Sequence, residues 1–104
     1  MPKQRAEGAQ AREVERLLRR FPELGHLRVR RRGDLLTLES GPRRDPIRHA
    51  RFRRDTVHLW RLEMATHTGR WQKTPFRDRL EALLELLVSA FPWTLAALEN
   101  PDRT

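Results

Sequence analysis

The chain has 104 residues, no cysteine and a formal net charge of +8 at pH 7. This length fits one domain with a modest core, and the lack of cysteine excludes disulfides, thiolate metal sites and thiol catalysis. No apolar run approaches the roughly 20 residues of a membrane-spanning helix, and residues 1–10 lack the apolar stretch of a signal peptide. We therefore expect a cytoplasmic protein with one globular domain over residues 9–104, preceded by a flexible segment at residues 1–8.

The first predicted element is an amphipathic helix over residues 9–21. Pro22 ends it, because proline has no amide hydrogen and clashes with the preceding turn. Apolar residues recur at the period of one helix face, namely Val14, Leu17, Leu18 and Phe21.

A β-hairpin is predicted next. Apolar and basic residues alternate from Leu27 onward, as they do along a half-buried strand. Gly33 and Asp34 suit a tight turn that leads into a leucine-rich second strand. A two-residue loop at this point places Arg28 opposite Glu39, where the two side chains form a cross-strand ion pair.

A second hairpin is predicted over residues 47–65, with its turn at Arg54 and Asp55. This turn places Phe52 opposite Val57 on the apolar face of the sheet. The other face then carries basic and aromatic side chains, namely His49, Arg51, Arg53, His58 and Trp60.

The C-terminal part is predicted to contain a short fifth strand over residues 70–73 and an amphipathic helix that begins at Thr74. Thr74 is a suitable N-cap and Pro75 a suitable first helical residue. An apolar stripe continues to Phe91, Pro92 ends the helix, and residues 93–98 should pack as an edge strand or a helical turn. The predicted fold class is therefore α+β: an N-terminal helix, an antiparallel meander of four or five strands and a C-terminal amphipathic helix, with the helices mainly on one face.

The segment HTGRW-x-x-TPF, which runs from His67 to Phe76, precedes a leucine-rich helix and the sequence Phe91, Pro92, Trp93. In these motifs the chain resembles a family of small uncharacterised bacterial proteins. The resemblance implies no known activity, ligand or cofactor.

A phosphate or another anion is one candidate ligand of this same segment. Free amides at a helix N-terminus attract anions, and Arg70, Lys73 and Thr74 lie where such a terminus is predicted. The alternative is a tight turn followed by an ordinary N-cap, and the segment lacks a glycine-rich phosphate loop.

Catalysis and metal binding find little support. The four histidines lack metal-site spacing, and His49 and His58, which share a face of the predicted sheet, lie among arginines that repel a cation. The acidic residues near the predicted sheet are mostly in turns, and neither Ser40 nor Ser89 lies in a nucleophile motif. We predict a non-enzymatic protein with no metal and no cofactor.

Nucleic acid is the partner that the charge distribution favours. Eleven arginines and only four acids lie between Arg28 and Arg61, a net charge of +7 against +8 for the whole chain. Arginine suits phosphates, and an aromatic ring between cationic groups stacks a base of RNA or single-stranded DNA. The predicted contact residues are Arg28, Arg30, His49, Arg51, Arg53, His58 and Trp60.

Two alternatives remain open. A GC-rich or heat-adapted source would favour arginine for compositional reasons, with surface ion pairs absorbing the charge. The apolar residues Trp60, Leu62, Met64 and 93–98 would also suit a protein-interaction or dimerisation domain, in which the arginines serve stability and solubility. A helix over Trp60 would make it ordinary core.

Overall fold

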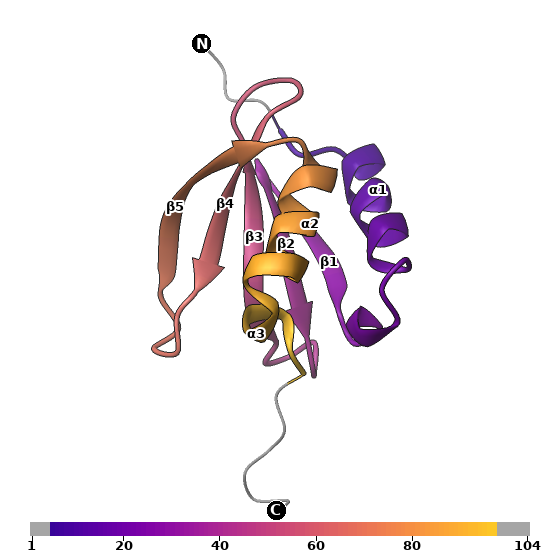
Figure 1. Ribbon diagram of the computed structural model, residues 1–104, viewed down its shortest axis with the longest axis vertical. Coiled ribbons are helices and arrows are strands. Elements are labelled where there is room, and N and C mark those ends of the chain that lie inside the picture. The colour runs from indigo at the N-terminus through magenta and orange to yellow at the C-terminus, as the bar shows by residue number, and fades with distance from the viewer. Residues whose placement is uncertain (1–4, 98–104) are drawn as a thin grey trace, which may run out of the picture.

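A sheet of five antiparallel strands in chain order, β1-β2-β3-β4-β5, forms the centre of the computed structural model, which describes residues 5–97. The helices lie on one side of this sheet (Figure 1), so the predicted α+β meander is confirmed. The elements are α1 (Gly8–Leu18), the 3-10 turn η1 (Pro22–Leu24), β1 (Arg28–Arg32), β2 (Leu35–Ser40), β3 (Ile47–Arg54), β4 (Trp60–Ala65), β5 (Trp71–Asp78), α2 (Leu80–Ala90) and α3 (Pro92–Leu95).

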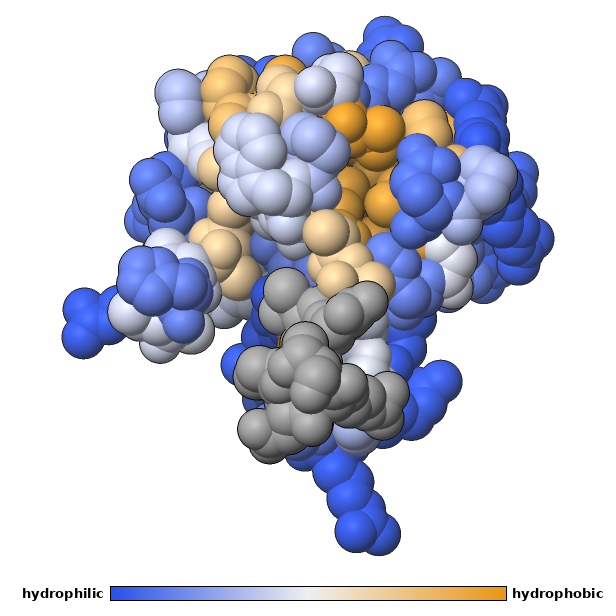
Figure 2. Space-filling view, turned by 60° about the horizontal axis from the view of Figure 1, so that its bottom comes forward, coloured by the Kyte–Doolittle hydropathy of each residue, from blue (hydrophilic) through white to orange (hydrophobic). Residues whose placement is uncertain are grey.

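The hydrophobic core lies between the helices and the covered face of the sheet. Seen from the end at which α3 lies, apolar side chains are visible in a hollow within a mostly hydrophilic surface (Figure 2). Within residues 5–97, no helix is long and apolar enough to cross a membrane. The largest fully buried side chains are Phe52, Leu36, Leu38, Leu62, Leu83, Leu84, Leu87, Leu95 and Val14.

Helix α1 ends at Leu18, three residues earlier than predicted. Proline disfavours the helical region for the residue before it. Phe21, which precedes Pro22, has extended backbone angles and is the N-cap of η1. Of the segment 1–8, which was expected to be flexible, residues 1–4 lie outside the described residues. Ala6 is buried, and its amide donates to the carbonyl of Gly33 at 2.9 Å.

The first hairpin agrees with the prediction. Arg28 pairs with Glu39 across β1 and β2, and its Nε donates to the Glu39 carboxylate at 3.2 Å. Gly33 has φ of +59°, a conformation that glycine adopts without strain. The two-residue turn therefore sets the register that local chemistry indicated.

The predicted register of the second hairpin is wrong. Phe52 pairs with Leu62, five residues beyond the expected Val57, and a loop over residues 55–59 replaces the tight turn. Within this loop the amide of Asp55 donates to the carbonyl of Leu59, and the Arg54 guanidinium donates to the carbonyl of Val57 at 2.7 Å. Because five is an odd number, the shift exchanges the two faces of β4.

A β-bulge at His49 changes the direction of one further side chain. Leu38 pairs with Ala50 while Glu39 pairs with Arg48, so His49 is the extra residue on β3. Its ring is buried and hydrogen-bonded to α3 instead of standing beside Arg51.

The predicted start of the C-terminal helix is also wrong, because Thr74 and Pro75 lie inside β5. The Thr74 hydroxyl donates to the carbonyl of Leu62 at 2.7 Å, and an edge strand tolerates the missing amide hydrogen of proline. The helix α2 begins at Leu80. Residues 92–95 form a helical turn, which was one of the two expected alternatives. Trp93, which was expected to be buried, is 67% exposed. Leu98 lies outside the described residues.

Candidate nucleic-acid interface

The face of the sheet that points away from the helices, here called the open face, is strongly basic. Strand alternation and the observed register place Arg30, Thr37, Arg51 and Glu63 side by side on this face. The cationic side chains of the open face are Arg28, Arg30, Arg32, Arg48, Arg51, Arg53, Arg61, Lys73 and Arg77.

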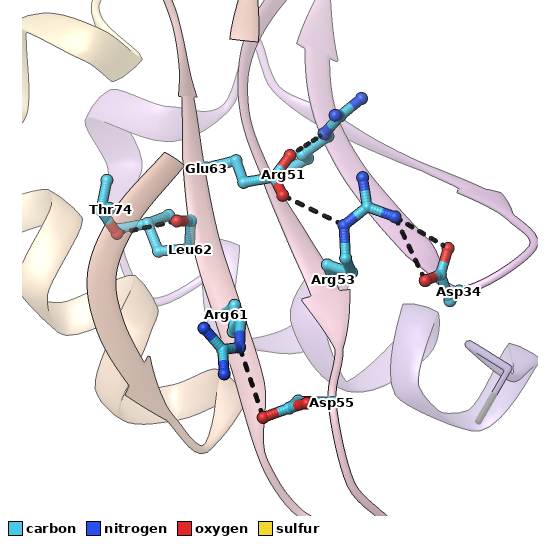
Figure 3. Close-up of polar contacts among 8 residues, drawn as sticks. All are labelled: Asp34, Arg51, Arg53, Asp55, Arg61, Leu62, Glu63 and Thr74. Carbon is cyan, nitrogen blue, oxygen red and sulfur yellow. Dashed lines mark hydrogen bonds and ion pairs between the residues drawn. The ribbon is translucent and has the colours of Figure 1, made fainter. Parts of the chain in front are cut away.

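A buried carboxylate organises the middle of the open face (Figure 3). Glu63 is only 3% exposed and accepts hydrogen bonds from Arg51 Nε at 2.6 Å and from Arg53 Nε at 3.0 Å. Arg53 also reaches Asp34 at 3.2 Å. Burial raises the pKa of Glu63, but the hydrogen bonds from the two arginines outweigh it and hold the pKa below its ordinary value. Glu63 is therefore ionised, and it fixes both guanidinium groups.

Two further carboxylates neutralise cations at the ends of the strands. Asp55 bonds both Arg77 and Arg61, the latter at 3.4 Å, and these contacts, led by the Arg77 hydrogen bond, lower the pKa of Asp55. At the opposite end Arg28 binds Glu39 and donates to the carbonyl of Gly41 at 2.6 Å. Much of the basic charge of the sheet is thus paired internally.

Four cations of the open face have no carboxylate partner among the described residues: Arg30, Arg32, Arg48 and Lys73. All four are exposed. The three arginines line a hollow of about 300 Å³, together with Leu35, Thr37, Arg51 and Trp71. An anion in this hollow would meet several unpaired guanidinium groups at once.

Trp71 is the aromatic member of this hollow. It pairs with Ala65 at the start of β5 and is half-buried. The Arg51 guanidinium carbon lies 4.2 Å from its ring centroid, a cation–π contact that orients the indole. Because Glu63 fixes Arg51, the ring is in turn positioned by the carboxylate network.

Of the predicted contact residues, Arg28, Arg30, Arg51 and Arg53 do lie on the open face, but the remaining three do not. Trp60 is 2% exposed beneath the helices, and His49 is buried beside α3. His58 is exposed in the loop 55–59, where it lines a separate hollow with Gln10 and Arg79. The odd register shift removed Trp60 from the open face.

The hollow on the open face also contains Trp71, Arg32 and Arg48, which the predicted set did not include. Arg32 and Arg48 could have been found from the sequence, because they lie on strands that already carried predicted contact residues. Trp71 had no comparable signal, since only the true pairing of β4 with β5 places it near Arg51.

The predicted anion site at Arg70, Lys73 and Thr74 is not formed. Thr74 caps no helix, because its hydroxyl binds Leu62 and accepts from the amide of Phe76. Arg70 belongs to the turn between β4 and β5, and the N-terminus of α2 lies farther along the chain at Leu80. Among residues 5–97, no group of three or more His, Asp or Glu side chains is placed to hold a metal ion.

Two histidines hold α3 in place, His49 from β3 and His26 from the segment that precedes β1. His49 Nδ1 donates to the carbonyl of Thr94 at 2.8 Å, which leaves Nε2 to accept from the Ser40 hydroxyl at 2.7 Å. His26 Nε2 donates to the carbonyl of Leu95 at 2.7 Å, and its ring meets that of His49 edge-on at 5.9 Å. Ser40 and His49 are both buried, so their contact serves packing.

The buried histidine predicts an acid-sensitive fold. Burial, opposed by the Thr94 hydrogen bond and assisted by His26, lowers the pKa of His49 from 6.5. The unfolded chain therefore binds the proton more readily, and the free energy of unfolding should fall as the pH drops below about 6.5. Urea unfolding between about pH 7.5 and pH 5 measures this slope. We expect His49→Gln to reduce the dependence of the unfolding free energy on pH, and His58→Gln, at an exposed site, to leave that dependence unchanged. Equal slopes in the two variants would contradict the assignment to His49.

The chain matches no protein-family model, no curated protein and no solved structure. Any function of the open face must therefore be inferred from its own side chains.

Proposed function

We propose that this chain is a non-enzymatic module that binds single-stranded nucleic acid through the open face of its sheet. The observation that carries the proposal is the hollow that the unpaired Arg30, Arg32 and Arg48 line together with Trp71, whose ring is positioned by Arg51. Guanidinium groups bind phosphates, and an aromatic ring on a sheet stacks an unpaired base. A domain that needs no disulfide suits a reducing compartment, so we place this activity in the cytoplasm.

The arginines of the open face divide into two roles. Arg51 and Arg53 are held by Glu63, and their charge is balanced by Glu63 and Asp34; they position the surface. Arg30, Arg32 and Arg48 supply the net positive charge that attracts the phosphates. Thr37 adds a hydroxyl donor at the centre of the same hollow.

Titration of labelled oligouridine and oligo-dT at several salt concentrations tests this function. Each phosphate neutralised on a single strand contributes about 0.7 to the slope of log affinity against log salt, so Arg48→Ala should lower the slope by about 0.7. Trp71→Ala should cost about 1–3 kcal/mol of binding free energy through lost base stacking.

Trp93→Ala is the matched control, because Trp93 is an exposed tryptophan on α3, on the helix side of the sheet. It should bind as the unaltered chain does. No binding at low salt, or equal losses for Trp71→Ala and Trp93→Ala, would refute the proposal.

Trp93 also favours a second candidate function, a protein-interaction or dimerisation domain. Its ring packs edge-on against Phe91 at 5.6 Å, and Phe91 contacts Phe76 at 5.8 Å, so an aromatic ridge reaches the surface. Trp60 and Leu62, which the sequence also offered for this role, are buried. Sedimentation of the same Trp93→Ala variant separates the two functions, because only an interface at the ridge would make self-association depend on Trp93.

A further inference from the structure

Arginines continue beyond the open face, around the edge of the sheet formed by β1. β1 is an edge strand with the sequence Arg-Val-Arg-Arg-Arg, and successive residues of a strand point to opposite faces. Arg30 faces the open side, whereas Arg31 extends to the helix side, where its Nη1 donates to the carbonyl of Ala6 at 3.4 Å. Both side chains belong to exposed residues. The edge is therefore basic on both sides.

Four neighbouring hollows connect the open face to α1. The open-face hollow shares Arg30 with a hollow of about 450 Å³ at the β1 edge. The edge hollow shares Arg28 with a groove of about 370 Å³ between α1, η1 and β1. That groove shares Arg19 with a hollow of about 380 Å³ along α1, which Arg12 and Arg16 also line. We call this series the arginine track.

The groove in the middle of the arginine track has an apolar floor. Leu18, Phe21 and Leu27 line it, together with the charged residues Glu15, Arg19 and Arg28. Helix α1 runs alongside β1 at this edge of the sheet (Figure 1). Phe21 is half-buried. Phe21 offers an aromatic ring for a base. Arg19, which has no carboxylate partner in the described part of the chain, offers a guanidinium for a neighbouring phosphate, whereas Arg28 is paired with Glu39.

The far end of the arginine track remains electropositive. Arg12, Arg16 and Arg19 have no carboxylate partner among residues 5–97, and all three are exposed. Glu15 is the one carboxylate that lines the hollow on α1, so three cations there face a single anion. In the edge hollow Glu39 is already paired with Arg28.

We propose that one strand of nucleic acid follows the arginine track from the open face around the β1 edge and along α1. This proposal rests on the proposed function of the open face and extends its footprint. The path bends around the edge of a single sheet, which a flexible single strand follows readily. A duplex, with a persistence length of about 150 base pairs, resists such a bend. The track therefore selects a single strand of sufficient length.

A length series with matched variants tests the arginine track. OB folds that bind single strands cover about 4–16 nucleotides. On this scale an oligouridine of about 5 nucleotides should occupy the open face alone, and one of about 16 should follow the whole track. The double variant Arg16→Ala with Arg19→Ala should lower the salt slope of the long oligonucleotide by about 1.4, from two lost phosphate contacts. The short oligonucleotide should bind that variant and the unaltered chain equally.

The control is Arg20→Ala with Arg79→Ala, which removes the same charge away from the track. Arg20 pairs with the exposed Glu81 of α2, and Arg79 lines a different hollow. Equal slope changes in the two double variants, or a duplex of the same length that depends on Arg16 and Arg19, would overturn the track. If the short oligonucleotide binds and the long one has no steeper slope of log affinity against log salt, the proposed arginine track is refuted and the open-face function is not. If the unaltered chain does not bind the short oligonucleotide, the open-face function fails.

Discussion

Replacing Glu63 by glutamine should lower the free energy of unfolding by about 3 kcal/mol. Glu63 is buried in the middle of the sheet and is the shared acceptor of Arg51 and Arg53. Glutamine keeps the size but loses the charge, so it leaves two partly buried guanidinium groups without their anion. Urea unfolding at pH 7 measures the loss.

The control for this substitution is Glu85→Gln, at an exposed position of α2 that has no ion pair in the part of the chain described. It should change stability by less than about 0.5 kcal/mol. The pKa of Glu63 is lowered in the folded state, so its contribution is present above the unfolded value of about 4.5 and is lost as the pH falls through the folded value. A loss in Glu63→Gln no larger than in Glu85→Gln would show that the network does not stabilise the sheet.

Trp60→Ala should lower the free energy of unfolding by about 3–5 kcal/mol. Its side chain lies in the core, 2% exposed, and the Arg54 guanidinium carbon is 5.5 Å from its ring centroid. Alanine would leave a large cavity beneath the helices and remove the packing partner of a buried arginine. Urea unfolding again measures the loss. Where enough protein remains folded, oligonucleotide affinity should be unchanged, because Trp60 does not reach the open face.

Trp71→Ala is the matched comparison for Trp60→Ala. Trp71 is half-buried in an edge strand, so its removal should destabilise the fold much less and weaken nucleic-acid binding more. Trp60→Ala should thus affect mainly the stability of the fold, and Trp71→Ala mainly the binding of nucleic acid. The reverse pattern, with binding lost in Trp60→Ala and stability lost in Trp71→Ala, would contradict the placement of the two faces.

The two hairpins show how far local chemistry predicts this fold. In the first, Gly33 adopts the positive φ that a tight turn needs, and the register with its Arg28–Glu39 ion pair follows from that turn. In the second, nothing local to Arg54 and Asp55 distinguishes a two-residue turn from the loop 55–59. The Arg54 guanidinium, which donates to the loop carbonyl of Val57, also donates to the carbonyl of Arg5, 49 positions away in the sequence.

The error in the second hairpin determined which candidate residues lie on the open face. Strand side chains alternate, so an odd shift moves every residue of β4 to the opposite face. It placed Trp60 and Leu62 in the core and brought Glu63 between Arg51 and Arg53. Arg30, Arg51 and Arg53 remained on the open face because they lie on strands whose own alternation did not depend on this hairpin.

The sequence by itself determined the α+β class, the meander, the first hairpin and the concentration of positive charge in the strands. These features depend on periodicity, composition and a glycine turn, all of which act over a few residues. Only the tertiary structure decided which arginines are paired, which tryptophan reaches the surface and where a ligand would meet unpaired charge. The reason is that ion pairs and strand registers join residues far apart in the chain. Arg30, Arg48 and Trp71 form one hollow only after β1, β2 and β3 pair and β4 brings β5 alongside.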